Sequence, residues 1–355
     1  MQKLLPFFNR RDSIYVRNID AGDYLENFLI ASVCSVLAIR FYLYITGYPQ
    51  IGIGHFHIAH MLWGGLLMMI AIFLLLCFLA KPTFQLAAVL GGIGFGTFID
   101  ELGKFITRDN NYFYQPTVMI LYIIFILLFL IVKAIDNETK LTRKEYLMNA
   151  LEMMKEVVLR DLDKEEKKRI RDFIRQSDHN DPVVKAIRHL LADIDAVMPQ
   201  QPSIFTRIRN SMSELYQRYV SKRWFYRTII GLFVLSSIIN VYEATKYIPY
   251  FLNPQLSTYL SISQWGQLLF SWLSGAFVLL GIYFFRSSRL MAYELFKRSI
   301  LISIFFTQVF IFYQEQFSSL IGLSADILIL VTIDYIISQE KIIHRHSYQE
   351  AANES

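Results

Sequence analysis

The sequence is poor in charge. Only 18% of its 355 residues are Asp, Glu, Lys or Arg, whereas a soluble domain usually carries about 25%. The deficit comes from long runs with no charged residue at all, such as 61–80 and 118–132. A helix needs roughly 20 apolar residues to cross a hydrocarbon core about 30 Å thick. The composition therefore argues against a soluble protein and predicts an all-α, polytopic membrane protein.

The sequence also contains few cysteines, and its first residues do not have the pattern of a secretory signal. The two cysteines, Cys34 and Cys77, fall within apolar runs and are expected to pack there, not to form a disulfide or bind a metal. The first twenty residues contain no apolar stretch of the length found in signal peptides, so no cleavable leader is expected. The formal charge of +5 requires no nucleic acid as a partner, because membrane proteins accumulate Lys and Arg in their cytoplasmic segments.

The apolar runs predict about eight transmembrane helices. Lys and Arg are nearly absent from one set of loops between them, in which Arg108 is the only basic residue. That asymmetry places both termini and the long polar central block in the cytoplasm. The predicted spans are 25–47, 57–80, 86–107, 117–135, 226–248, 262–285, 293–314 and 319–337.

Four predicted spans lie on each side of the central block. Together with the tail, this arrangement divides the chain into four predicted parts. They are a first membrane half (1–135), a cytoplasmic helical domain (136–224), a second membrane half (225–340) and a cytoplasmic tail (341–355). Because four is even, the second half would repeat the first in parallel orientation, and Trp63 would correspond to Trp272. The repeat is a hypothesis that rests on few identities.

The central block has the signals of ordinary helices. Acids after Asp163 and the Asp181-Pro182 step predict two helix starts, and apolar residues from Val184 to Ile194 recur with a helical period. The run 164–171 fits either a solvated helix face or a patch for anionic lipid. Nothing in the block resembles a phosphate loop or a catalytic triad, so its expected role is assembly or regulation through a partner that binds residues 140–222.

Ionisable residues of three consecutive spans are predicted to reach one level of the membrane. Asp100 lies about 21 Å along the third span from its cytoplasmic end, and Arg40 lies about as far along the first. The second span runs the other way, so His57 and His60 fall near its non-cytoplasmic end. These side chains would form a polar chamber close to the outer surface.

The third span also carries glycines at a spacing that suits close helix packing. Gly92, Gly96 and Asp100 are four residues apart, so Asp100 would face a neighbouring helix or a cavity, not lipid. Lys104 continues that stripe and could pair with Asp100, whereas Glu101 points about 100° away. A charge within a membrane costs about 2.5–3.5 kcal/mol on insertion scales, which favours a functional interpretation over a self-satisfied structural network.

The histidines are compatible with a metal site. His57 and His60 share a helical face, and with Asp100 or Glu101 they could bind a divalent metal such as zinc or iron. Hydrogen bonding or proton transfer by His60 is the alternative. In the next loop, Asn111 stands among aromatic residues that are typical of a membrane interface, and its amide could line the mouth of a site.

Three motifs resemble a family of bacterial multi-pass membrane proteins that has no assigned activity. The motifs are HMLWGG (60–65), GIGFGTFIDELGKF (92–105) and NYFYQP (111–116), and the resemblance covers roughly residues 40–125. It implies a location in the bacterial cytoplasmic (inner) membrane and little chemistry. The matched polar positions are His60, Asp100, Glu101, Lys104 and Asn111.

These observations predict a transporter or channel-like protein for a small ion or polar solute. Its site would comprise Arg40, His57, His60, Asp100, Glu101, Lys104 and Asn111. A membrane-embedded metal-dependent hydrolase or lipid-modifying enzyme is the first alternative, and a non-catalytic scaffold or sensor is the second. The lipid bilayer is the expected partner, and self-association into a homo-oligomer is compatible with the sequence.

Overall fold

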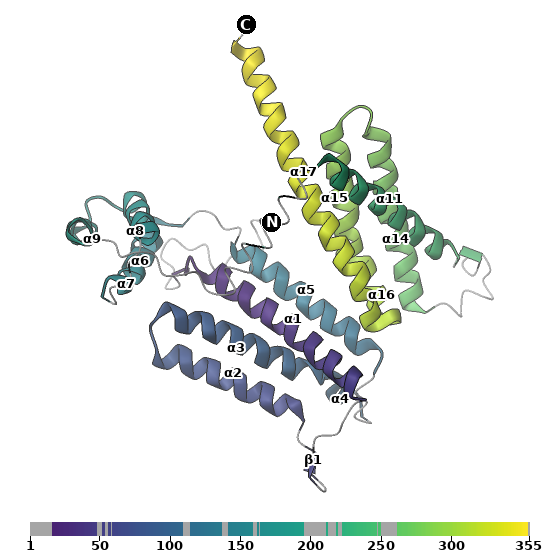
Figure 1. Cartoon of the computed structure of the whole chain (residues 1–355), viewed down its shortest axis with the longest axis horizontal. Helices are drawn as coiled ribbons and strands as arrows, with labels where there is room; N and C mark the ends of the chain where they lie inside the picture. The colour runs from purple at the N-terminus through teal and green to yellow at the C-terminus, as the bar shows by residue number, and fades with distance from the viewer. Residues whose placement is uncertain are drawn as a thin grey trace. The chain divides into compact units, whose positions relative to one another are not determined.

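The chain is helical almost throughout. The computed structural model describes residues 16–47, 59–108, 114–136, 141–158, 164–194, 222–246 and 261–353, with short pieces at 52–53, 56–57, 162, 211, 218 and 248–249. Its one described strand pairing is two residues long and joins β1 (Gly52–Ile53) to β2 (Phe56–His57). The chain divides into two compact units, Met1–Ile106 with Leu127–Ser203 and Thr107–Ile126 with Ile204–Ser355 (Figure 1).

The first unit contains three long apolar helices, each of a length and composition that could cross a membrane. They are α1 (Ala21–Thr46), α2 (His60–Cys77) and α3 (Lys81–Asp100), and a short helix, α4 (Leu102–Ile106), follows α3. Pro82 in the first turn of α3 suits a helix start, because its missing N–H has no partner there in any case. Both α1 and α2 pack along α3, as Figure 1 shows.

Glycines on two faces of α3 allow this close packing. A Cβ added at Gly96 would lie 2.3 Å from the carbonyl oxygen of Ser32 on α1, and one at Gly92 would lie 2.4 Å from that of Phe28. On the other face, a Cβ at Gly94 would lie 2.7 Å from the carbonyl oxygen of Gly64 on α2. The predicted glycine seam is thus confirmed, and α3 uses it against both neighbours.

The polar central block folds into four helices with a small apolar core. They are α6 (Arg143–Met153), α7 (Lys155–Val158), α8 (Lys164–Gln176) and α9 (Pro182–Asp193). The predicted starts of α8 and α9 are confirmed, and Asp181 caps α9 by accepting a hydrogen bond from the N–H of Val183. Val184, Ile187 and Leu191 are buried against residues of α6 and α8, as their helical spacing predicts.

A salt bridge ties the segment before α1 to this helical block. The Arg17 guanidinium donates to both carboxylate oxygens of Glu145, through Nε at 2.8 Å and Nη2 at 3.0 Å. Thr142 adds a capping box, in which the Glu145 side chain also accepts from the Thr142 N–H. Hydrogen bonds from Arg17 outweigh the effect of burial and lower the pKa of Glu145 from 4.5 to about 2.

We expect this pair to make the stability of the helical block sensitive to acid. A depressed pKa means that the ionised carboxylate stabilises the fold at neutral pH, and that this contribution is lost as the pH falls from about 4.5 to about 2. The loss is on the order of 3 kcal/mol. Cleavage of 141–158 by pepsin across that range should accelerate in the wild type. In the Glu145→Gln variant, cleavage should already be fast at pH 4.5, and its rate should change less as the pH falls further.

Glu152→Gln is the matched control on the same helix, because Glu152 is 55% exposed and pairs with Lys155 at the surface. This variant should keep the pH profile of the wild type. Identical profiles for Glu145→Gln and the wild type would show that the Arg17–Glu145 pair does not stabilise the block.

The second unit is built on helices α11 (Arg223–Thr245) and α14 (Ile262–Phe284) and a long helical hairpin. The first arm of the hairpin comprises α15 (Arg289–Ile302), the π-helix η1 (Ser303–Thr307) and α16 (Gln308–Glu315). The chain then turns through η2 (Gln316–Ser319) into α17 (Leu320–Asn353). The first residues of α5 (Pro116–Asp136) also belong to this unit.

Contacts between the two arms show that they are antiparallel. Lys297 pairs with Asp334 at 2.5 Å, and Ser303 donates to Asp326 at 2.8 Å, so residues further along the first arm meet residues earlier in α17. Gln316, with φ 53°, sits at the reversal and is the sole non-glycine residue with positive φ in the described chain. The core of the unit comprises Ile229, Phe233, Val278, Tyr293, Phe296, Ile300, Ile304, Ile329, Ile333, Ile336 and Ile337.

Six helical runs among the described residues are long and apolar enough to cross a membrane. The run Arg289–Glu340 counts as one of them and contains the predicted seventh and eighth spans, and the apolar part of α11, Thr228–Glu243, is shorter than a full span. In the apolar stretches of α1 and α2 only 11% of residues are buried within the chain, which leaves surfaces that lipid could cover. The chain is thus compatible with a membrane protein, and the count of eight and the repeat stay predictions.

Candidate functional site

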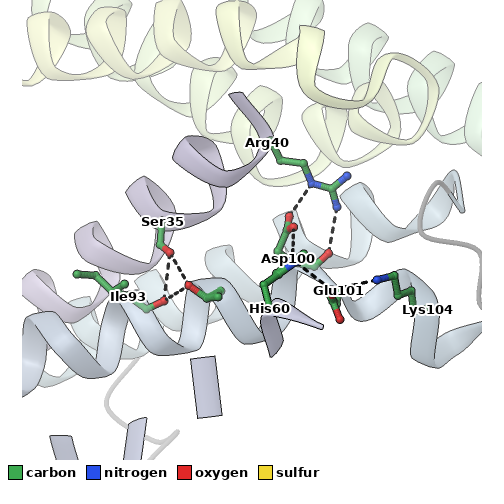
Figure 2. Close-up of polar contacts among 8 residues, drawn as sticks. Ser35, Arg40, His60, Ile93, Asp100, Glu101 and Lys104 are labelled. Carbon is green, nitrogen blue, oxygen red and sulfur yellow. Dashed lines mark hydrogen bonds and ion pairs between the residues drawn. The ribbon is translucent and has the colours of Figure 1, made fainter. Parts of the chain in front are cut away.

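The described residues of the predicted site lie in one network at the end of α3 (Figure 2). Helix α3 ends at Asp100, Glu101 forms a turn, and α4 begins at Leu102. The side chains of Asp100 and Glu101 are 0% and 1% exposed. The sequence predicted a continuous helix to residue 107, in which these two acids would point apart. The break at Glu101 instead allows one histidine to contact both.

Arg40 reaches this network from α1. Its Nε donates to Oδ1 of Asp100 at 2.6 Å, and its Nη2 donates to the backbone carbonyl of the same residue at 3.0 Å. The second bond gives a backbone carbonyl at the end of α3 a side-chain donor. Closer to the middle of the helices, Ser35 hydrogen-bonds Thr97 at 2.9 Å and donates to the carbonyl of Ile93, so α1 is fixed on α3 beside the network (Figure 2).

His60, the first residue of α2, bridges the two carboxylates. Its Nε2 lies 3.2 Å from Oδ2 of Asp100, and its Nδ1 lies 2.9 Å from Oε1 of Glu101. Lys104 on α4 donates to the same Oε1 of Glu101 at 3.0 Å. The other oxygen of Glu101, Oε2, is buried and has no hydrogen-bond partner.

His60 could donate hydrogen bonds to both carboxylates only if it carried one proton more than a neutral imidazole provides. A neutral imidazole donates from one nitrogen and accepts at the other, whereas an ionised carboxylate only accepts. With both acids ionised, both nitrogens must donate, so His60 is an imidazolium. With a neutral imidazole, hydrogen bonds to both acids would require one acid to carry a proton. The arrangement therefore offers a position for a proton among His60, Asp100 and Glu101.

The charges of the network nearly cancel. Arg40 and Lys104 supply two positive charges against the two carboxylates, so the formal sum is zero with His60 neutral and +1 with one proton added. Near-neutrality lowers the cost of burying these groups, although the orphaned Oε2 of Glu101 still costs about 1–3 kcal/mol or more. The buried lone pair is the position in this network at which a proton or a small cation could bind.

The described side chains do not form the metal site that the sequence left open. Among the described residues, no group of three or more His, Cys, Asp and Glu side chains could hold a metal ion. Both nitrogens of His60 already face carboxylate oxygens at hydrogen-bonding distance. Only the backbone of His57 is described, as part of β2, so its predicted role as a ligand lies outside the described side chains. Asn111 also lies outside the described residues.

The sequence analysis missed a second buried acid. Asp326 on α17 is 8% exposed and lies on the inner side of the helical hairpin, where Ser303 and Gln308 donate to its Oδ2. An acid within the apolar run of the eighth predicted span was the available signal. The predicted site was drawn only from the first three spans and the loop after the third, so it did not include this acid.

No protein-family model, no curated protein and no solved structure matches this chain. The family resemblance of the three motifs therefore stays a prediction, and the function has to be argued from the site itself.

Proposed function

We propose that this protein is a proton-coupled membrane transporter for a small cation or polar solute, and that His60, Asp100 and Glu101 carry its coupling proton. The observation that supports the proposal is the bridge made by one histidine between two fully buried carboxylates. Such a bridge is suited to hold a proton, and Arg40, His60 and Asp100 lie on three separate helices. A small movement of α1, α2 or α3 would change which group holds the proton.

The proposal includes a topology. Eight crossings would follow if α11 and both arms of the hairpin each span the membrane, in the bacterial inner membrane with both termini in the cytoplasm. The scarcity of Lys and Arg in the loops 48–56, 108–116, 249–261 and 315–318 supports that orientation. The network then lies near the non-cytoplasmic surface, where a substrate would enter. The helical block 141–194 would regulate transport or bind a cytoplasmic partner.

The location of the network argues for a function beyond packing. Ionisable residues within membrane helices are costly and commonly mark ion pathways and proton relays. A purely structural cluster would be expected to satisfy all its buried atoms, yet Oε2 of Glu101 has no partner. An unpaired carboxylate oxygen next to a shared proton is suited to exchange that proton with a bound cation.

Proton movement in reconstituted liposomes would test this function. Purified protein would be placed in liposomes that contain a pH-sensitive dye, and a gradient of Na⁺ or K⁺ would be imposed. In the wild type, protons should move across the membrane in the direction opposite to the imposed flow of the cation. Asp100→Asn and Glu101→Gln should each slow that movement at least tenfold, because an amide cannot take part in the proton exchange.

Asp172→Asn is the control, since Asp172 is 46% exposed on α8 and pairs with Arg175 at the surface. It should transport as the wild type does. Absence of cation-driven proton movement in the wild type, or equal movement in the wild type and both network variants, would refute the proposal.

A further inference from the structure

A second polar site lies inside the second unit and is separate from the Asp100 network. A small cavity there, with a free volume of about 10 Å³, has the size of a single water-sized particle. Apart from Phe233, its lining side chains all carry oxygen. They come from α11, α14, the π-helix η1 and α17: Ser236, Ser237, Asn240, Ser271, Ser274, Ser303, Thr307 and Asp326.

Several oxygens in and beside this cavity have no partner. Oγ of Ser271 and Oγ1 of Thr307 line it, are buried and make no hydrogen bond. Oε1 of Gln308 is buried and unpartnered as well, although the amide nitrogen of that side chain donates to Asp326 at 3.2 Å. Buried polar atoms are nearly always satisfied in native proteins, so this concentration of orphaned oxygens marks a polar site that a water molecule or a small ion would complete.

Asp326 supplies the charge of the site. Its described hydrogen bonds both go to Oδ2 and come from neutral groups, the Ser303 hydroxyl at 2.8 Å and the Gln308 amide. Within the described part of the chain, no Lys, Arg or His forms an ion pair with it. A carboxylate buried among apolar helices without a counter-charge is strongly disfavoured, so it needs either a proton or a bound cation.

The π-helix η1 brings two hydroxyl side chains, Ser303 and Thr307, to the cavity. Single-turn π-helices are rare, widen the helix locally and occur frequently at functional sites. This one spans Ser303–Thr307, so the first and last residues of η1 both line the cavity. Tyr122 of α5 donates to the carbonyl of Ile304 at 2.7 Å and so satisfies one backbone oxygen of the irregular turn.

We propose that this cavity binds a dehydrated monovalent alkali cation, with Asp326, Ser271 and Thr307 as ligands. Carboxylate, hydroxyl and amide oxygens suit hard cations. One carboxylate balances one positive charge, whereas Ca²⁺ sites use 6–8 oxygens that commonly include several carboxylates. The volume admits one such ion without its water shell. The inference does not rest on the transport proposal, because binding is an equilibrium property of the purified protein.

Cation-dependent stabilisation of the purified full chain would test the site. Thermal unfolding would be followed in detergent at constant ionic strength while choline is replaced by Na⁺, Li⁺ or K⁺. The wild type should be stabilised in a saturable way by at least one of the three ions, as a ligand of the native state requires. Thr307→Val and Ser271→Ala should raise the apparent dissociation constant of that ion at least tenfold, and Asp326→Asn should abolish the effect.

Thr332→Val is the matched control for Thr307→Val. Thr332 is fully buried on α17, the helix of Asp326, but its hydroxyl donates to the carbonyl of Leu328 and does not line the cavity. It should retain the affinity of the wild type. The proposal is refuted if no alkali ion stabilises the wild type more than choline, if only Ca²⁺ or Mg²⁺ does, or if Thr307→Val and Thr332→Val behave alike. Should Asp326→Asn fail to fold, the two hydroxyl variants still decide between these outcomes.

Discussion

Replacing Arg40 by Met should destabilise the protein by about 3–5 kcal/mol, because it removes one partner of a buried ion pair. Asp100 is fully buried, and Arg40 holds both its carboxylate, at 2.6 Å, and its backbone carbonyl, at 3.0 Å. Without the guanidinium, the remaining network has one positive charge fewer and an unsatisfied carbonyl. Denaturant unfolding of the purified protein in detergent would measure the change in free energy.

A double variant separates the charge effect from lost packing. In Arg40→Met/Asp100→Asn the buried charge is gone together with its partner, so the double variant should be more stable than Arg40→Met alone. Arg175→Met removes an exposed arginine that lies 3.5 Å from Asp172, and should remain within about 0.5 kcal/mol of the wild type. If Arg40→Met were as mild as Arg175→Met, the pair with Asp100 would not stabilise the fold.

Much of the helical architecture could be predicted from the sequence because it follows from local patterns. Long apolar runs located α1, α2, α5 and α14, and the capping residue Asp181 with Pro182 located the start of α9. The end of α3 could not be predicted in this way. Position 101 is neither glycine nor proline, so no helix-breaking residue marks the end of α3. The break is accompanied by contacts of the Glu101 side chain with His60 and Lys104.

The members of the site were more predictable than their pairing. Helix rise alone placed Arg40, His60 and Asp100 at one level, and the structure brings them into contact. The pairing of Lys104 with Glu101 has ordinary i,i+3 spacing, whereas the bridge by His60 accompanies the break in α3, which no local pattern encodes. The cavity at Asp326 was missed for a related reason: its hydroxyls come from three separate elements, and Ser and Thr are common in membrane helices without any site.

Replacing Gly96 by Ala should destabilise the packing of α1 on α3 by about 1–3 kcal/mol, and Gly96→Leu should cost more. The new Cβ would lie 2.3 Å from the carbonyl oxygen of Ser32 and 2.9 Å from Cβ of Ser35. The first of these atoms belongs to the backbone, so the clash cannot be relieved by a side-chain rotation. Helix α1 would have to move away from α3. Denaturant unfolding in detergent, as for Arg40→Met, would measure the loss.

Gly65→Ala is the matched control, because no atom lies within 4 Å of a Cβ at Gly65 in α2. Alanine favours a helix over glycine by about 1 kcal/mol, so this variant should be unchanged or slightly more stable. Similar losses for the two variants would mean that the seam is not tightly packed. A displaced α1 also carries Arg40 away from Asp100, since the bond between them is short and joins the same two helices. Gly96→Ala should therefore cost less in an Arg40→Met background than in the wild type, whereas strictly additive losses would show that helix packing and the ion pair are independent.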